Sequence, residues 1–206
     1  MWYNPVTMKQ RLALLALGLV MLSGCFFWKK KELTPFDIEG RRLAVVMPFS
    51  YAGSDKAYSD VPGPFASKLS SALFETKRLR MIDPKRLETT LNELKISTGT
   101  TLDSSQIAAV CKQLKAEVAI YGTVLLAQKE SEKYKGKVYE TLSISAEAKL
   151  VQANTAEIIS KGGATGKASV KYKEGSAPPA EVLTNAALSD TAKQVAEQLV
   201  SDLTAK

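Results

Sequence analysis

The pattern of apolar and polar residues divides the chain into an apolar N-terminal run, a short polar segment and a region that alternates strands with helices. Residues 43–47 are continuously apolar, which is typical of a strand buried on both faces. Residues 50–61 indicate a loop. From Pro64, apolar side chains recur every four positions through residues 65–73, as on the buried side of a helix. Residues 79–82 predict a short second strand.

Two more helices and a third strand follow. Asp83 can cap free backbone NH groups and Pro84 is tolerated at a first helical position, so a helix is predicted to begin there. Another helix begins near residues 103–104 and carries Cys111 on its apolar face, where we expect a small core residue rather than a reactive thiol. Residues 118–127 are a strongly apolar strand.

The last third of the chain changes to a period of two. Residues 142–151 alternate apolar and polar side chains, the pattern of a strand with one covered face and one wet face. A tight turn at residues 154–155 and a returning strand over residues 157–169 complete a hairpin. A long amphipathic helix ends the chain, and its buried positions are Leu188, Ala192, Val195, Leu199 and Leu203.

The predicted fold class is α/β. A single domain, residues 43–206, has a mixed sheet in which a parallel βα section precedes a C-terminal antiparallel hairpin, with helices flanking the sheet. The glycine-rich residues 162–167 superficially suggest a phosphate loop, but their spacing is wrong and they lie inside a predicted strand. We interpret them as a bulged or twisted part of that strand.

Catalytic chemistry has little support in the sequence. The chain contains no histidine, which removes the commonest general base and the commonest nitrogen ligand of zinc. Its acidic residues show no metal-ligand spacing. The sequence does not exclude two carboxylates that are distant along the chain but adjacent in the folded protein. We therefore predict no catalytic residue, no metal and no cofactor.

The N-terminus indicates export. A short apolar run at residues 12–22 follows basic residues and is too short to span a bilayer, as in a secretory signal peptide. It ends in Leu-Ser-Gly-Cys, which resembles the bacterial lipobox. That resemblance implies acylation of Cys25 and removal of residues 1–24, with translation starting at Met1 or Met8. An ordinary signal peptide with an incidental cysteine is the alternative. Phe26 in place of an aspartate implies, by analogy, sorting to the outer membrane.

Residues 25–42 form a lipidated tether, roughly 60 Å long if fully extended and about 25 Å as a flexible coil. Aromatic residues prefer the membrane interface, and lysines are attracted to anionic headgroups. We therefore expect five tether residues to contact the membrane surface: Phe27, Trp28, Lys29, Lys30 and Lys31.

Lysines crowd two polar segments, residues 129–137 and 171–179, which we predict to be loops. The chain has 28 basic and 21 acidic residues, a modest excess. The lysines form either an ordinary solvated face or a surface for an anionic partner such as a lipid or polysaccharide. Export makes a nucleic-acid partner improbable. The six lysines are Lys129, Lys133, Lys135, Lys137, Lys171 and Lys173.

Several segments carry a family resemblance, namely residues 42–49 ending in Pro-Phe, 65–74, 79–83, 87–94 and the Val-Ala-Ile-Tyr-Gly strand within 116–124. They resemble the periplasmic lipoproteins grouped around the curli secretion protein CsgG, including PelC-like proteins of polysaccharide export and LpoB-like activators of peptidoglycan synthases. The likeness extends over about residues 42–204. It implies a fold more strongly than a function.

Departures from the family favour one layout. CsgG-type pores use two long barrel hairpins, whereas the corresponding segments here are short and polar, so we expect no pore. LpoB-like proteins have a long linker. PelC-like proteins combine a lipid anchor, a short tether and no barrel hairpins, and they assemble into a ring beneath an outer-membrane channel.

The leading hypothesis is an outer-membrane lipoprotein on the periplasmic side. It would act without enzymatic activity as an accessory or ring-forming subunit of polysaccharide or fibre secretion, as a homo-oligomer or with an export partner. An LpoB-like activator that binds a peptidoglycan synthase is the alternative. A periplasmic hydrolase is a third hypothesis with little support.

Overall fold

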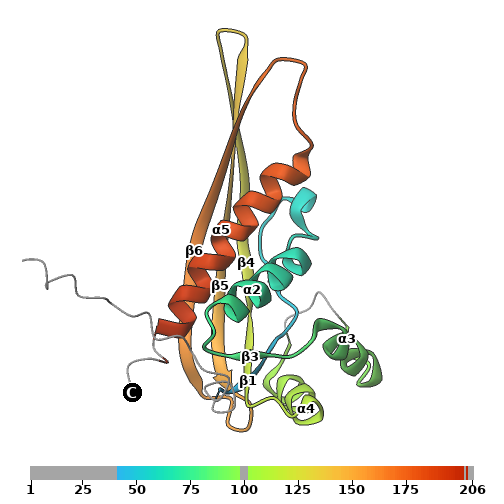
Figure 1. The fold of residues 1–206 in the computed structure, drawn as a ribbon. Helices are drawn as coiled ribbons and strands as arrows, with labels where there is room; N and C mark the ends of the chain where they lie inside the picture. The colour runs from blue at the N-terminus through green and yellow to red at the C-terminus, as the bar shows by residue number, and fades with distance from the viewer. Residues whose placement is uncertain (1–40, 98–101, 202, 204–206) are drawn as a thin grey trace, which may run out of the picture. The chain divides into compact units, whose positions relative to one another are not determined.

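The computed structural model describes residues 41–97, 102–201 and 203. Cys25 and the five membrane-contact residues of the tether lie outside these residues, so the hypotheses about them stay predictions. In chain order the elements are β1 (Leu43–Val46), β2 (Ser50–Tyr51), the 3-10 helix η2 (Lys56–Tyr58), α2 (Pro62–Glu75), β3 (Arg80–Met81), α3 (Pro84–Glu93), α4 (Ser104–Leu114), β4 (Val118–Tyr134), β5 (Lys137–Gln152), β6 (Ile158–Lys173) and α5 (Ala180–Ser201) (Figure 1).

The strands form one mixed sheet in the order β3-β1-β4-β5-β6, and β2 pairs with β4 off this path. The pairs β3–β1 and β1–β4 are parallel, while β4–β5 and β5–β6 are antiparallel. The predicted α/β fold class and the mixed sheet are therefore confirmed. Parallel pairs need crossover connections, which α2 and the α3–α4 pair supply.

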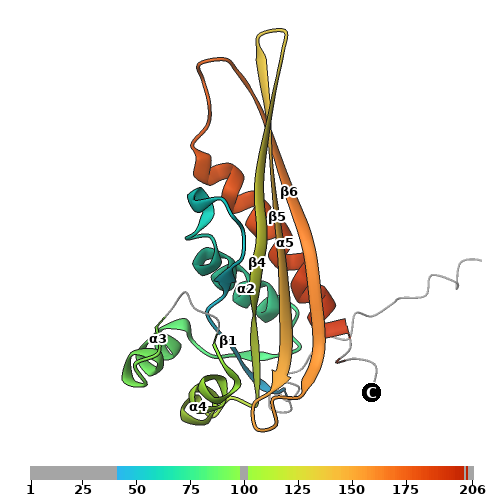
Figure 2. The same cartoon turned by 180° about the vertical axis from the view of Figure 1, so that it is seen from behind.

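Helices cover both faces of the parallel section. Ala44 and Val46 pack in one apolar cluster with residues of α2 and α5, whereas Val45 and Met47 pack in a second cluster with residues of α3 and α4. Burial on both faces explains why residues 43–47 are continuously apolar. Beyond this section, α5 runs along β5 and β6 on one side of the sheet (Figures 1 and 2).

The helix starts follow from local capping. Asp83 accepts a hydrogen bond from the backbone nitrogen of Lys85, at 2.8 Å. Asp103 forms a reciprocal capping box with Gln106. Both starts agree with the sequence analysis. Helix α2 begins at Pro62, two residues earlier than predicted, because a proline at either position fits a first helical turn.

The predicted polar loop at residues 129–137 is wrong over most of its length, whereas the one at residues 171–179 is wrong only over residues 171–173 and is confirmed over residues 174–179. Strand β4 continues to Tyr134, β5 begins at Lys137, and β6 continues to Lys173. Lys135 and Gly136 form the tight turn between β4 and β5 with positive φ values of 50° and 70°. Strands with water on both faces lack apolar alternation, so the pattern resembled a loop. Residues 50–61, also predicted as a loop, contain β2 and η2.

The glycine-rich stretch lies inside β6, as predicted, but it is not bulged. Residues 161–173 pair with β5 in unbroken register, and the register shifts lie elsewhere. An added Cβ at Gly162 would lie 3.0 Å from the carbonyl oxygen of Val195, and one at Gly166 would lie 2.7 Å from that of Ala187. Glycine is required here because α5 approaches the strand closely.

Cys111 is 2% exposed on α4, as predicted for a core residue. Burial raises the pKa of its thiol to about 11. Because the thiolate is the reactive species, we expect Cys111 of a Cys25→Ala variant to resist a thiol reagent at about pH 8. Labelling should become fast after unfolding in guanidinium chloride. Fast stoichiometric labelling of the native protein would contradict this.

No helix among the described residues is long and apolar enough to cross a membrane.

Candidate functional site

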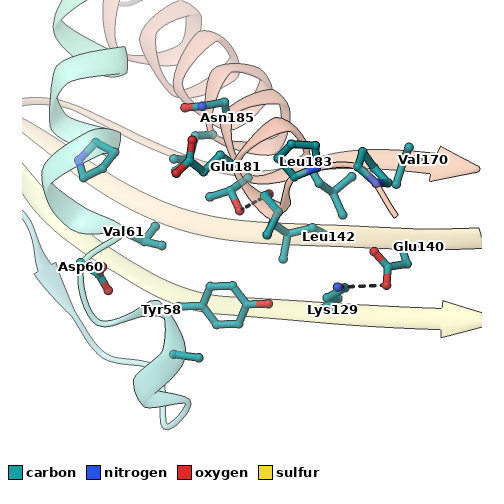
Figure 3. Close-up of a pocket in the computed structure, with 17 residues that line it drawn as sticks. Tyr58, Asp60, Val61, Lys129, Glu140, Leu142, Val170, Glu181, Leu183 and Asn185 are labelled. Atoms are coloured by element: carbon teal, nitrogen blue, oxygen red, sulfur yellow. Dashed lines mark hydrogen bonds and ion pairs between the residues drawn. The ribbon is translucent and has the colours of Figure 1, made fainter. Parts of the chain in front are cut away.

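A groove of about 690 Å³ lies where the first turns of α5 meet the η2–α2 segment above the sheet (Figure 3). Strands β4, β5 and β6 supply its floor, and the prolines before α5 close one wall. Apolar side chains make up much of the lining, namely Val61, Pro64, Leu142, Val170, Pro178, Pro179, Leu183 and Leu188. Tyr58 extends over the floor from η2 in the same view.

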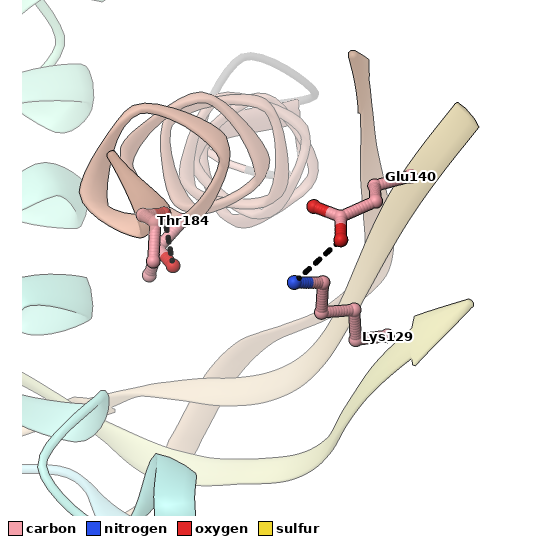
Figure 4. A network of polar contacts seen from close by, with 4 residues as sticks. Lys129, Glu140 and Thr184 are labelled. Atoms are coloured by element: carbon pink, nitrogen blue, oxygen red, sulfur yellow. Dashed lines mark hydrogen bonds and ion pairs between the residues drawn. The ribbon is translucent and has the colours of Figure 1, made fainter. Parts of the chain in front are cut away.

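An ion pair occupies the floor of the groove. Lys129 Nζ lies 3.0 Å from Glu140 Oε1, and both side chains lie on the side of the sheet that faces α5 (Figure 4). Hydrogen bonds from Lys129 and then from Tyr172 lower the pKa of Glu140 below its usual value. The hydrogen bond to Glu140 also raises the pKa of Tyr172. Glu140 is thus held as a carboxylate at neutral pH and accepts hydrogen bonds.

The remaining charges of the groove are acidic. Asp60 comes from the segment before α2, and Glu181 from the first turn of α5. Because Lys129 is neutralised by Glu140, the groove keeps an acidic excess on apolar walls. Such a site can hold an apolar segment or a cationic group. Among residues 41–97, 102–201 and 203, no cluster of three acidic or cysteine side chains could hold a metal ion.

The six lysines predicted as one anionic-partner surface do not lie on one surface. Lys129 and Lys133 point to the α5 side and pair with Glu140 and Glu174. Lys135 lies in the hairpin turn, with its ammonium 4.9 Å from the ring centre of Tyr134.

The other three predicted lysines face away from α5. Lys137 pairs directly with Lys173 in the β5–β6 register, and Lys171 pairs with Tyr139, so all three share the opposite face. The ammonium of Lys171 lies 5.1 Å from the ring centre of Tyr139.

Three lysines that the sequence analysis did not single out belong to this same face. Lys149 pairs with Lys161, and Lys167 pairs with Ser143. Each of these lysines is an even number of residues from Lys137 or Lys173 on its own strand, so it lies on the same face of the sheet. The period-two pattern of the hairpin could have identified them. We name these six residues the lysine stripe: Lys137, Lys149, Lys161, Lys167, Lys171 and Lys173.

The fold defines an α/β domain whose antiparallel strands continue past the start of its last helix. No protein-family model matches the sequence, and no curated protein is similar to it.

Among solved structures, the chain is similar to the LpoB C-terminal domain from Salmonella enterica, with 15% identity and a TM-score of 0.42 over 63% of this chain and 82% of that one. It is similar to lipoprotein GNA1162 from Neisseria meningitidis, with 15% identity and a TM-score of 0.46 over 69% and 90%. It is also similar to the PelC dodecamer from Paraburkholderia phytofirmans, with 10% identity and a TM-score of 0.41 over 79% and 88%. LpoB and PelC are therefore among the structural neighbours, and the sequence had already indicated a resemblance to both groups of proteins.

Proposed function

We propose that this chain is a lipoprotein held in the outer membrane through Cys25, where it faces the periplasm as a non-enzymatic accessory subunit of an export or envelope-assembly system. The observation that carries the proposal is the face opposite α5, formed by β4 after residue 126 and by the parts of β5 and β6 that lie alongside it. Its β4 and β6 side chains are exposed, and those of β5 are exposed or half-buried. A broad uncovered face of this kind suits association with a partner.

The chemistry of the groove supports a binding role over a catalytic one. Its lysine and its central glutamate are paired with each other, and the lowered pKa of Glu140 makes it a poor proton donor. The chain has no histidine to serve as an alternative general base. An acidic groove with apolar walls can still seat a segment of a partner protein.

Assembly tests the subunit role. We expect native mass spectrometry of the full chain, purified from membranes in detergent, to show a homo-oligomer or a complex with an outer-membrane export partner. A strict monomer at high protein concentration would overturn the ring-forming version. Co-purification of a peptidoglycan synthase instead would favour the LpoB-like alternative.

The anchor is tested separately. We expect Cys25→Ala to move the protein from the membrane fraction to the soluble fraction, because several acyl chains on one residue give stable anchoring and their loss removes it. Cell fractionation and immunoblotting measure the change. The matched control is Cys111→Ala, which replaces the chain's other cysteine and should stay with the membrane. Retention of Cys25→Ala in the membrane fraction would contradict the proposal.

A further inference from the structure

The lysine stripe follows two adjacent strands along the face opposite α5. Lys161, Lys167, Lys171 and Lys173 lie on β6, while Lys149 and Lys137 lie beside them on β5. The distance from residue 161 to residue 173 along β6 is roughly 40 Å at the usual rise of an antiparallel strand. Two neighbouring strands lie only about 5 Å apart, so the stripe is long and narrow.

The lysines of the stripe carry more positive charge than the acidic side chains around them can balance. Within the described residues, the ion pairs Lys129–Glu140 and Lys133–Glu174 lie on the other face, and no ion pair involves a stripe lysine. Glu147 is the one acidic side chain on the stripe's own two strands on this face. Glu130 and Glu132 lie on the same face of the neighbouring strand β4. Six lysines against these three glutamates still leave a local positive excess that attracts anions.

Hydroxyl groups lie between the lysines. Ser145 and Thr165 hydrogen bond to each other at 2.8 Å, and Thr141 and Ser169 do so at 2.8 Å. Each hydroxyl keeps further capacity to donate or accept. Ser143 lies in the row between them. Tyr139 adds an aromatic ring with a polar tip, which suits contact with a sugar ring.

A hollow marks one end of the stripe. A cavity of about 380 Å³ is lined by Tyr121, Glu147, Lys149, Lys161 and the side-chain-free Gly163. An added Cβ at Gly163 would lie 3.3 Å from the flexible side chain of Glu147 and 3.6 Å from the carbonyl oxygen of Ala146. The hollow therefore gives space for a ring-sized group between two lysines.

We propose that the lysine stripe binds a linear glycan that carries carboxylates at regular intervals. The lysines supply the countercharge, the hydroxyl rows meet sugar hydroxyls, and the narrow width fits one extended chain. A planar anionic membrane fits less well, because it would also meet Glu130 and Glu132 on the adjoining strand β4. The inference rests on the proposed periplasmic accessory role and specifies the partner class.

The test measures binding of the full chain, in detergent, to polygalacturonate by isothermal titration calorimetry. The stripe variant is Lys167→Gln/Lys171→Gln/Lys173→Gln. Its matched control is Lys129→Gln/Lys133→Gln/Lys135→Gln, which removes the same charge from the α5 side and the turn. We expect the stripe variant to bind at least about tenfold more weakly, and the control to change by less than about twofold. Binding should weaken as salt rises.

Additional ligands in the same experiment identify the chemistry that the stripe recognises. Methyl-esterified polygalacturonate and neutral dextran should not bind, since neither carries the carboxylates. Equal losses in the two triple variants would overturn the proposal, because binding would then follow net charge alone. Stripe-dependent binding to phosphatidylglycerol vesicles without binding to polygalacturonate would also overturn it, in favour of a lipid surface.

These outcomes are separable from those of the proposed function. Loss of glycan binding with membrane anchoring and oligomerisation intact would remove only the ligand assignment. Thermal unfolding followed by circular dichroism should give midpoints within a few degrees of each other for the two triple variants, because all six substituted side chains are exposed and the two ion pairs lost in the control are surface pairs that contribute little.

Discussion

Gly166→Ala is expected to lower the free energy of unfolding by about 3 kcal/mol, because the new methyl group has no space between β6 and α5. It would overlap the backbone nitrogen and hydroxyl oxygen of Thr191 and lie 2.7 Å from the carbonyl oxygen of Ala187. All of these atoms belong to the closest turn of α5, so the helix must move away from the sheet.

The same substitution breaks a buried polar link. The hydroxyl of Thr191 accepts a hydrogen bond from the backbone nitrogen of Gly166, at 3.1 Å, and lies 3.1 Å from the carbonyl oxygen of Ile144 and 2.8 Å from that of Ala187. Thr191 is 0% exposed, so no water can replace a lost partner without a larger opening. Steric overlap and lost hydrogen bonding therefore act in the same direction.

Urea unfolding followed by far-ultraviolet circular dichroism measures this effect. The matched control is Gly163→Ala on the same strand but the opposite face, where the new methyl group meets the exposed side chain of Glu147 at 3.3 Å and the carbonyl oxygen of Ala146 at an ordinary contact distance of 3.6 Å. The control should change stability by less than about 0.5 kcal/mol. Equal stability of the two variants would show that α5 does not approach β6 as described.

Phe65→Ala is the second large expected effect, a loss of about 4 kcal/mol. Phe65 is 0% exposed and packs edge-on against Phe49, with ring centres 5.0 Å apart and planes at 72°. Truncation leaves a cavity between α2 and the sheet, and the buried side chains around it, such as Leu69, can relax into it only partially.

The control for this prediction lies on the same helix. Phe74 is 68% exposed, so Phe74→Ala removes the same atoms from α2 without opening a cavity. We expect a change below about 1 kcal/mol in the same urea experiment. If the two alanine variants unfold at the same urea concentration, Phe65 is not part of a packed core.

The sequence was informative where one local cause determines structure. The strand at residues 43–47 follows from burial on both of its faces, and the helix starts at Asp83 and Asp103 follow from side-chain caps. The buried side of α2 follows from apolar residues at every fourth position. Each depends on residues within a turn or two of one another. For this reason the α/β class and most elements were correctly predicted.

Features that depend on distant segments were missed. The ends of β4, β5 and β6 lack a covered face, so their polar residues gave no strand signal. The need for glycine at position 166 comes from Thr191, which is 25 residues away in sequence. The division of the lysines between two faces depends on strand register, which composition does not report.

The hydroxyl of Thr191 has a consequence for the order in which the domain completes its structure. This group bridges Gly166 and Ile144, so the pairing of the last two strands at that point is completed by a residue of the final helix. Until α5 packs against the sheet, the backbone nitrogen of Gly166 lacks its Thr191 hydroxyl acceptor, although the neighbouring residues of β5 and β6 can already pair. The hydrogen bonding of the sheet at this point is therefore completed only when the last helix of the chain has docked.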